Sequence, residues 1–117
     1  MSANRSAFLQ VEEEDGRTTV RLPAGTILSE SNSEEFAREL LALAEPKERP
    51  HLTVDLGGVV MLTSVILGKF LAINGHVRDR GGRFTLFNVN SNVYEVFVKS
   101  RLDTILEVHA IANPLPA

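Results

Sequence analysis

Two neighbouring hydroxyl residues, Thr63 and Ser64, stand where an apolar segment at residues 54–62 gives way to a helical pattern. The first backbone N–H groups of a helix have no partner within it, and the helix dipole adds partial positive charge at that end. A phosphate on Ser64 would be stabilised there, which makes Ser64 a candidate phosphorylation switch. Capping of the helix by Ser64 or Thr63 is the more common role of such residues. The pattern leaves both interpretations open.

The other residues with catalytic or ligand chemistry form no recognised constellation. His51, His76 and His109 are far apart, and none has a second histidine or a suitable carboxylate at metal-ligand spacing. No glycine-rich segment matches a phosphate-binding loop, and Ser64 lacks the flanking glycines of a hydrolase elbow. A nucleotide-binding or hydrolytic protein is therefore a remote alternative, and the sequence predicts no metal and no catalytic residues.

Strand and helix patterns alternate in the first half of the chain. Residues 8–14 and 17–22 alternate apolar and polar side chains around an acidic turn with a glycine, which predicts a β-hairpin. Ser31 and Glu34 have the spacing of a capping box. They precede an amphipathic pattern that predicts a helix over about residues 32–45.

The second half continues this alternation. Residues 52–56 predict a third strand, and a helix is predicted to follow from Ser64 to the glycine pair at 81–82. Residues 84–89 predict a fourth strand, Ser91 can cap a third helix, and residues 104–108 predict a last strand. The expected core stripe of the helix that begins at Ser64 consists of Ile66, Phe70, Ile73 and Val77.

These elements predict one compact domain. A chain of 117 residues, 44% of them hydrophobic, has room for a single core. The order β-β-α-β-α-β-α-β favours an α/β fold (α+β in some classifications) in which a small mixed β-sheet has helices packed on it. We expect the domain at residues 8–109, between a flexible N-terminus at 1–7 and a C-terminal tail at 110–117.

Composition narrows the class of protein further. Twelve Lys and Arg against fifteen Asp and Glu give a formal charge of −3, and the sequence has no basic run that would suit a nucleic-acid backbone. The absence of cysteine is compatible with a reducing compartment. No run approaches the ~18 apolar residues of a membrane span, and the N-terminus has no apolar signal core. We expect a cytoplasmic protein without direct nucleic-acid binding or membrane insertion.

Three motifs spread over residues 8–109 resemble the STAS domain, in particular the stand-alone anti-sigma-factor antagonists of bacteria. Residues 54–68, V-D-L-G-G-V-V-M-L-T-S-V-I-L-G, are similar to the family's V-x-D-L-S-G-V-x-x-L/I/M-D-S-S/T-G-L-G. Residues 81–89, G-G-R-F-T-L-F-N-V, are similar to G-G-x-L-x-L-x-N-V, and Arg101-Leu-Asp103 stands where G-L-D is usual.

The resemblance implies a non-enzymatic switch that needs no cofactor. In this family the unphosphorylated domain binds an anti-sigma factor that is also a serine kinase, and phosphorylation of one serine releases it. Ser64 occupies the position of that serine, Thr63 is a less favoured acceptor, and a phosphatase would reverse the step. Thr63 stands where the family has Asp, Val65 where it has Ser or Thr, and Ile66 where it has Gly.

We expect the partner to bind the region between Met61 and Lys69. Val65 lies opposite the predicted core stripe and should be exposed, while Gly68 would let another backbone approach closely. A structural STAS subunit of a larger signalling or lipid-transport assembly, without a phosphorylation cycle, is the alternative, and the oligomeric state stays open. The predicted partner-binding residues are Met61, Thr63, Ser64, Val65, Gly68 and Lys69.

Overall fold

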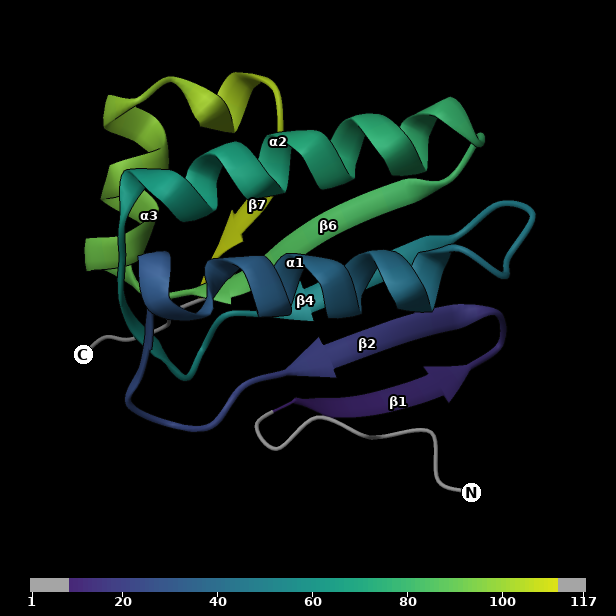
Figure 1. Cartoon of the computed structure of the whole chain (residues 1–117). Helices are drawn as coiled ribbons and strands as arrows, with labels where there is room; N and C mark the ends of the chain where they lie inside the picture. The colour runs from purple at the N-terminus through teal and green to yellow at the C-terminus, as the bar shows by residue number, and fades with distance from the viewer. Residues whose placement is uncertain (1–8, 112–117) are drawn as a thin grey trace.

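The computed structural model describes residues 9–111, and Figure 1 shows the arrangement of the chain. The predicted segment at 1–7, Phe8 of the first predicted strand, and residues 112–117 of the predicted tail lie outside the described residues. The elements are β1 (Gln10–Glu14), β2 (Arg17–Arg21), β3 (Thr26–Leu28), α1 (Glu30–Ala44), β4 (His51–Asp55), β5 (Val59–Leu62), α2 (Ser64–Asp79), β6 (Arg83–Val89), α3 (Ser91–Lys99), a short 3-10 helix (Leu102–Thr104) and β7 (Glu107–Ala110).

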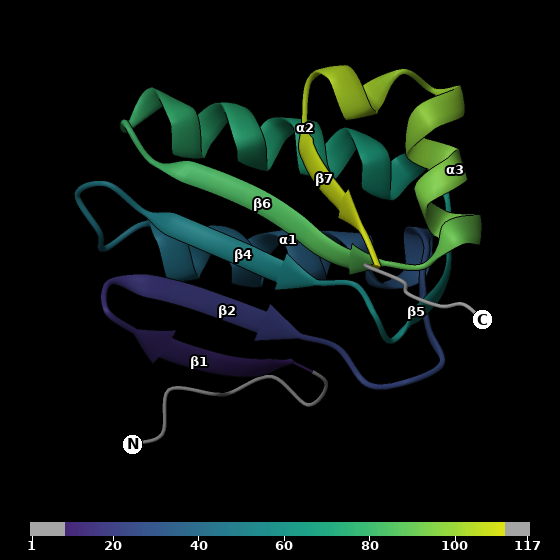
Figure 2. The same ribbon diagram turned by 180° about the vertical axis from the view of Figure 1, so that it is seen from behind.

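Five strands form one mixed sheet in the order β1-β2-β4-β6-β7. The hairpin strands β1 and β2 are antiparallel, as the sequence predicts, and every other neighbouring pair in this sheet is parallel. Helices α1 and α2 lie side by side on one face of the sheet (Figure 1), and Figure 2 shows no helix of the described chain over the other face. The predicted α/β class with a small mixed sheet is therefore confirmed.

The core lies between the sheet and these two helices and is centred on Phe70 of α2. Its ring centroid lies 6.1 Å from that of Phe36 on α1, 6.1 Å from Phe84 on β6 and 6.2 Å from Phe97 on α3. Aromatic rings at such distances interact favourably beyond the burial of their surface. The four residues of the predicted α2 stripe, Ile66, Phe70, Ile73 and Val77, are all fully buried.

Two strands that the sequence pattern does not predict, β3 and β5, pair in parallel as a separate two-stranded sheet. β3 has only three residues, and β5 has both ends buried and both central residues exposed, so neither shows the strict alternation of a longer strand. This small sheet leads directly into α2, since Thr63 alone separates the end of β5 from the start of the helix. The N–H of Thr63 donates to the carbonyl of Leu28 at 3.0 Å and so fixes this junction against β3.

Two predicted helix caps are wrong by one or two residues. Helix α1 is capped at Ser29, whose N–H donates to the Asn32 carboxamide oxygen at 2.9 Å, so the predicted box of Ser31 and Glu34 does not form. Helix α3 is capped by Asn90, which accepts a hydrogen bond from the N–H of Val93 at 3.0 Å. A carboxamide accepts such a bond as well as a hydroxyl does, so Asn90 serves as the cap of α3 and Asn32 takes the place of the expected glutamate in the capping box of α1.

The last strand is displaced from the predicted 104–108 to Glu107–Ala110. The chain first forms the 3-10 helix, which begins after Arg101 in a left-handed conformation with φ of 64°. The hydroxyl of Thr104 donates to the Arg101 carbonyl at 2.7 Å and so stabilises this turn. Residues 104–106, which the sequence pattern places in the last strand, therefore lie in the 3-10 helix and the turn that follows it.

Candidate functional site

Ser64 is the first residue of α2, and this helix begins at the end of the molecule where the parallel strands β2, β4 and β6 finish (Figure 1). The residue is exposed, and its hydroxyl has no hydrogen-bond partner within residues 9–111. Ser64 sits inside the first helical turn, so it is not the N-cap residue of α2. The capping interpretation is therefore wrong for Ser64.

Thr63 occupies the N-cap position but does not cap the helix either. Its side-chain oxygen makes no capping hydrogen bond, and it is buried without a hydrogen-bond partner among the described residues. The two neighbouring hydroxyls thus differ in environment: that of Thr63 is enclosed, whereas that of Ser64 faces solvent. A reagent or an enzyme that approaches from solvent reaches Ser64 first.

Exposed apolar side chains gather on the elements that lead into Ser64. We call Ile27, Val60, Met61 and Val65 the apolar patch; their exposed fractions are 49%, 55%, 55% and 36%. Ile27 on β3 and Met61 on β5 are register partners, so they are neighbours across the two-stranded sheet. Clusters of exposed apolar groups are typical of protein-binding surfaces.

The structure gives the remaining predicted partner-binding residues different surroundings. Gly68 is exposed, and a Cβ atom added to it would have nothing within 4 Å, so the helix surface is open there. Lys69 is half-buried, and its Nζ donates to Glu34 Oε2 at 2.9 Å. This bond joins α2 to α1 and lowers the pKa of Glu34. Lys69 therefore has a partner within the chain and is less available than Ser64 or Val65.

A carboxylate that the sequence analysis did not single out holds the loop ahead of β5. Asp55 Oδ1 accepts hydrogen bonds from the Gly57 N–H at 2.8 Å and from the Asn88 carboxamide at 2.9 Å. Its second oxygen lies 3.4 Å from Arg21 Nε. Asp55 and Asn88 lie at the C-terminal ends of adjacent parallel strands. That shared position is the feature of the sequence from which their contact could have been predicted.

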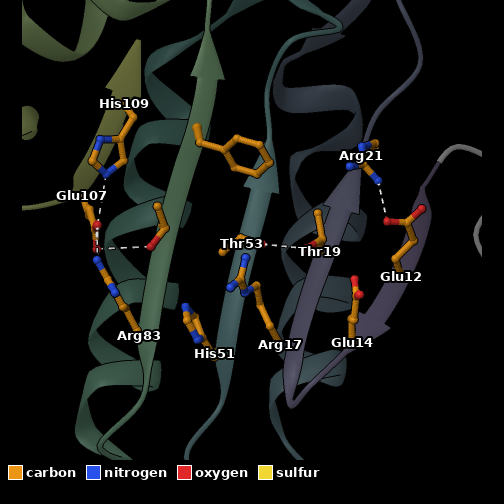
Figure 3. Close-up of a pocket in the computed structure, with 12 residues that line it drawn as sticks. Glu12, Glu14, Arg17, Thr19, Arg21, His51, Thr53, Arg83, Glu107 and His109 are labelled. Carbon is orange, nitrogen blue, oxygen red and sulfur yellow. Dashed lines mark hydrogen bonds and ion pairs between the residues drawn. The ribbon is translucent and has the colours of Figure 1, made fainter. Parts of the chain in front are cut away.

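The uncovered face of the sheet carries a groove of about 520 Å³ that we call the open-face groove (Figure 3). At one border, Arg83 donates to both oxygens of Glu107, at 2.9 and 2.5 Å. His109 lies 3.0 Å from the same carboxylate, and Thr85 donates to it at 3.2 Å. The guanidinium of Arg83, followed by these weaker partners, lowers the pKa of Glu107 to about 2.

No group of three or more His, Cys, Asp or Glu side chains within residues 9–111 is arranged to hold a metal ion. In the same part of the chain, no helix has the length and apolar character required to cross a bilayer.

Comparisons with known proteins place these features in a family. A family model described as "Mlab, STAS domain" matches residues 9–107. An anti-sigma-factor antagonist (STAS) domain protein from Planctomyces limnophilus is 22% identical, with a TM-score of 0.78 over 87% of this chain and 89% of the other. An anti-sigma factor antagonist from Mycobacterium paratuberculosis is 21% identical, with a TM-score of 0.75 over 93% and 90%. No curated protein matches the chain.

A third solved structure shows the same fold at lower similarity. The anti-sigma factor antagonist SpoIIAA in its unphosphorylated form is 16% identical, with a TM-score of 0.60 over 83% of this chain and 96% of the other. The agreement of the three structures with this chain concerns the fold.

Proposed function

We propose a function from the premise that this chain belongs to the STAS domain family. In this proposal it is a non-enzymatic regulatory protein of the cytoplasm that binds an anti-sigma factor with serine kinase activity, and phosphorylation of Ser64 releases that partner. The observation that carries the proposal is the exposed, unpartnered hydroxyl of Ser64 next to the apolar patch. The fold shared with anti-sigma-factor antagonists supports it.

The surroundings of the two hydroxyls favour Ser64 over Thr63 as the phosphate acceptor. A kinase must bring its nucleotide and a catalytic base to the hydroxyl, and the Thr63 oxygen is buried in the folded domain. Ser64 needs no local unfolding to be reached. Its position in the first turn of α2 would also place a phosphate near the positive end of a helix of 16 residues.

Release follows from the charge of the modified residue. A phosphate carries roughly −1.5 to −2 charges at neutral pH. Next to Val65 and Met61 it would lie at the border of an apolar contact, and desolvating it on binding would cost free energy. The same patch therefore supports binding when Ser64 is free and opposes it when Ser64 is phosphorylated.

The direct test is a titration of a kinase-type anti-sigma factor with variants of Ser64. We expect Ser64→Ala to bind like the wild type and Ser64→Glu to bind more weakly. Ser91→Glu is the matched control, because Ser91 is also an exposed serine at the first position of a helix. Equal affinities for Ser64→Ala and Ser64→Glu would contradict the switch, and equal weakening by Ser91→Glu would show that the effect is not local.

A second candidate is a structural STAS subunit of a larger signalling or lipid-transport assembly with no phosphorylation cycle. Thr63 favours it, since the related pattern has a carboxylate at that position and the side chain of Thr63 here neither caps α2 nor makes any other hydrogen bond within the described chain. Mass spectrometry of the protein from its native cell separates the two candidates. Abundant phosphoserine at Ser64 supports the switch, and its absence under all growth conditions supports the structural subunit.

A further inference from the structure

The open-face groove lies away from the Ser64 surface, on the sheet face opposite α1 and α2 (Figures 2 and 3). Its floor is formed by β2, β4 and β6, and residues of β1 and β7 stand at its two borders. Nothing in the proposed partner-binding function uses this face.

Three basic side chains form a row across the floor of the groove. Arg17, His51 and Arg83 are the first residues of β2, β4 and β6, and the register places them directly beside one another. Adjacent strands lie about 4.8 Å apart, so the three Cα atoms span roughly 10 Å. Figure 3 shows the imidazole of His51 between the side chains of Arg17 and Arg83. We call these three residues the basic row.

Two members of the basic row have unused hydrogen-bonding groups. Arg83 is held by Glu107, whereas Arg17 and His51 have no side-chain hydrogen bond or ion pair within residues 9–111. Glu14 is the register partner of Arg17 on β1, yet no ion pair joins them. The guanidinium of Arg17 therefore lines the groove with no donor used by another group of the described chain.

The electrostatic surroundings of His51 also favour an anion next to the basic row. Partial burial lowers the pKa of His51, and the charges of Arg17 and Arg83 lower it further. A neutral imidazole still donates one N–H, so His51 can contribute a hydrogen bond without adding to the repulsion within the row. An anion placed over the row would reduce the repulsion between the two guanidinium groups.

We propose that the basic row binds the phosphate group of a small phosphomonoester. Guanidinium groups donate two parallel hydrogen bonds to phosphate oxygens, and Arg17 is free to do so while Glu107 orients Arg83. The volume of the groove falls within the range of small-molecule sites. Hydroxyl groups of the next row along the strands, including Thr19 and Thr53, would face the body of the ligand.

The acidic borders of the groove limit the size of the anion. Glu12 and Glu14 stand on the β1 side, and Glu107 stands on the β7 side. An extended anionic surface such as a lipid bilayer would meet these carboxylates and be repelled. A compact phosphate on a small molecule reaches the basic row without that contact.

The test is an NMR titration of the full-length, isotope-labelled chain with inorganic phosphate and with glycerol 3-phosphate. We expect saturable shifts centred on the first residues of β2, β4 and β6. Arg17→Gln should weaken binding of either probe by about tenfold, the usual effect of losing a charge-assisted hydrogen bond. Arg17→Lys keeps the charge and should weaken it less. Arg38→Gln, an exposed arginine of α1 on the other side of the sheet, is the matched control and should bind like the wild type.

Each alternative result overturns the proposal. Shifts that do not saturate at millimolar phosphate, or that centre on another surface, would show that the row is not a site. Equal weakening by Arg17→Gln and Arg38→Gln would indicate a general charge effect. Binding to vesicles of phosphatidic acid without binding to either soluble probe would assign the row to a membrane instead. The spectra of the variants report directly whether each one is folded.

Discussion

Removing the charge of Glu107 should lower the stability of the protein at neutral pH. Its pKa falls from 4.5 to about 2, first because Arg83 donates hydrogen bonds to it. A change of one unit in a pKa corresponds to about 1.4 kcal/mol, so the lowered pKa of Glu107 corresponds to roughly 3 kcal/mol of stabilisation of the folded state. The side chains of Arg83 and Glu107 are 57% and 27% exposed, however, so water screens the pair. We therefore expect Glu107→Gln to cost about 1 kcal/mol at pH 7.

The sign of the pH dependence follows from the direction of the shift. A carboxylate whose pKa is lowered by folding stabilises the folded state fully above its unfolded pKa of 4.5. That contribution is lost as the pH falls from 4.5 towards 2, because the unfolded chain takes up the proton first. The difference between the wild type and Glu107→Gln should therefore shrink over this interval and be nearly gone at about pH 2.

Urea denaturation followed by circular dichroism at a series of pH values measures this difference. Glu95→Gln is the matched control: Glu95 is an exposed glutamate of α3 without an ion pair in the described chain, and its replacement should leave stability unchanged at every pH. A loss in Glu107→Gln that stays constant from neutral to acid pH would refute the reasoning. It would mean that the loss comes from packing around the side chain and not from its charge.

Two further predictions concern residues on the segments around Ser64. Gly58→Ala should destabilise the fold by about 1–3 kcal/mol in urea denaturation, since the added Cβ would lie 2.5 Å from the Pro23 carbonyl oxygen. Gly68→Ala, where nothing lies within 4 Å, should leave stability equal or slightly higher; equal losses in both variants would contradict this. Ile27→Asp should weaken partner binding in the titration described above without lowering the melting temperature, because Ile27 is 49% exposed. Ile105→Asp, 56% exposed and outside the apolar patch, should bind normally.

The long elements could be predicted because each carries a periodic pattern of its own. Strand β2 of the hairpin has buried side chains at every second position, and the stripe that includes Ile66 and Phe70 repeats at helical spacing, so the sequence pattern predicts both elements. The strands β3 and β5 have three and four residues and gain their stability from each other, which a local pattern does not show. Ile27 was therefore missed, although it completes the apolar patch beside Met61.

The basic row illustrates a different limit of sequence reasoning. Arg17, His51 and Arg83 are separated by more than thirty residues at each step and form no cluster along the chain. Parallel pairing in register brings them together, and it is fixed by the apolar residues on the opposite face of the same strands. The absence of a basic run predicts that the protein has no nucleic-acid surface, but it does not exclude a local anion site.

The replacement of a carboxylate by Thr63 bears directly on whether Ser64 can carry a phosphate. An aspartate at the N-cap would accept a hydrogen bond from the first turn of α2 and would place a negative charge next to Ser64. Thr63 does neither, because its hydroxyl is buried and makes no capping bond. The first-turn N–H groups are then left without a side-chain partner, and a phosphate on Ser64 would meet no adjacent carboxylate. The departure from the family pattern thus removes a competitor for those N–H groups, so it is compatible with phosphorylation at Ser64 on physical grounds.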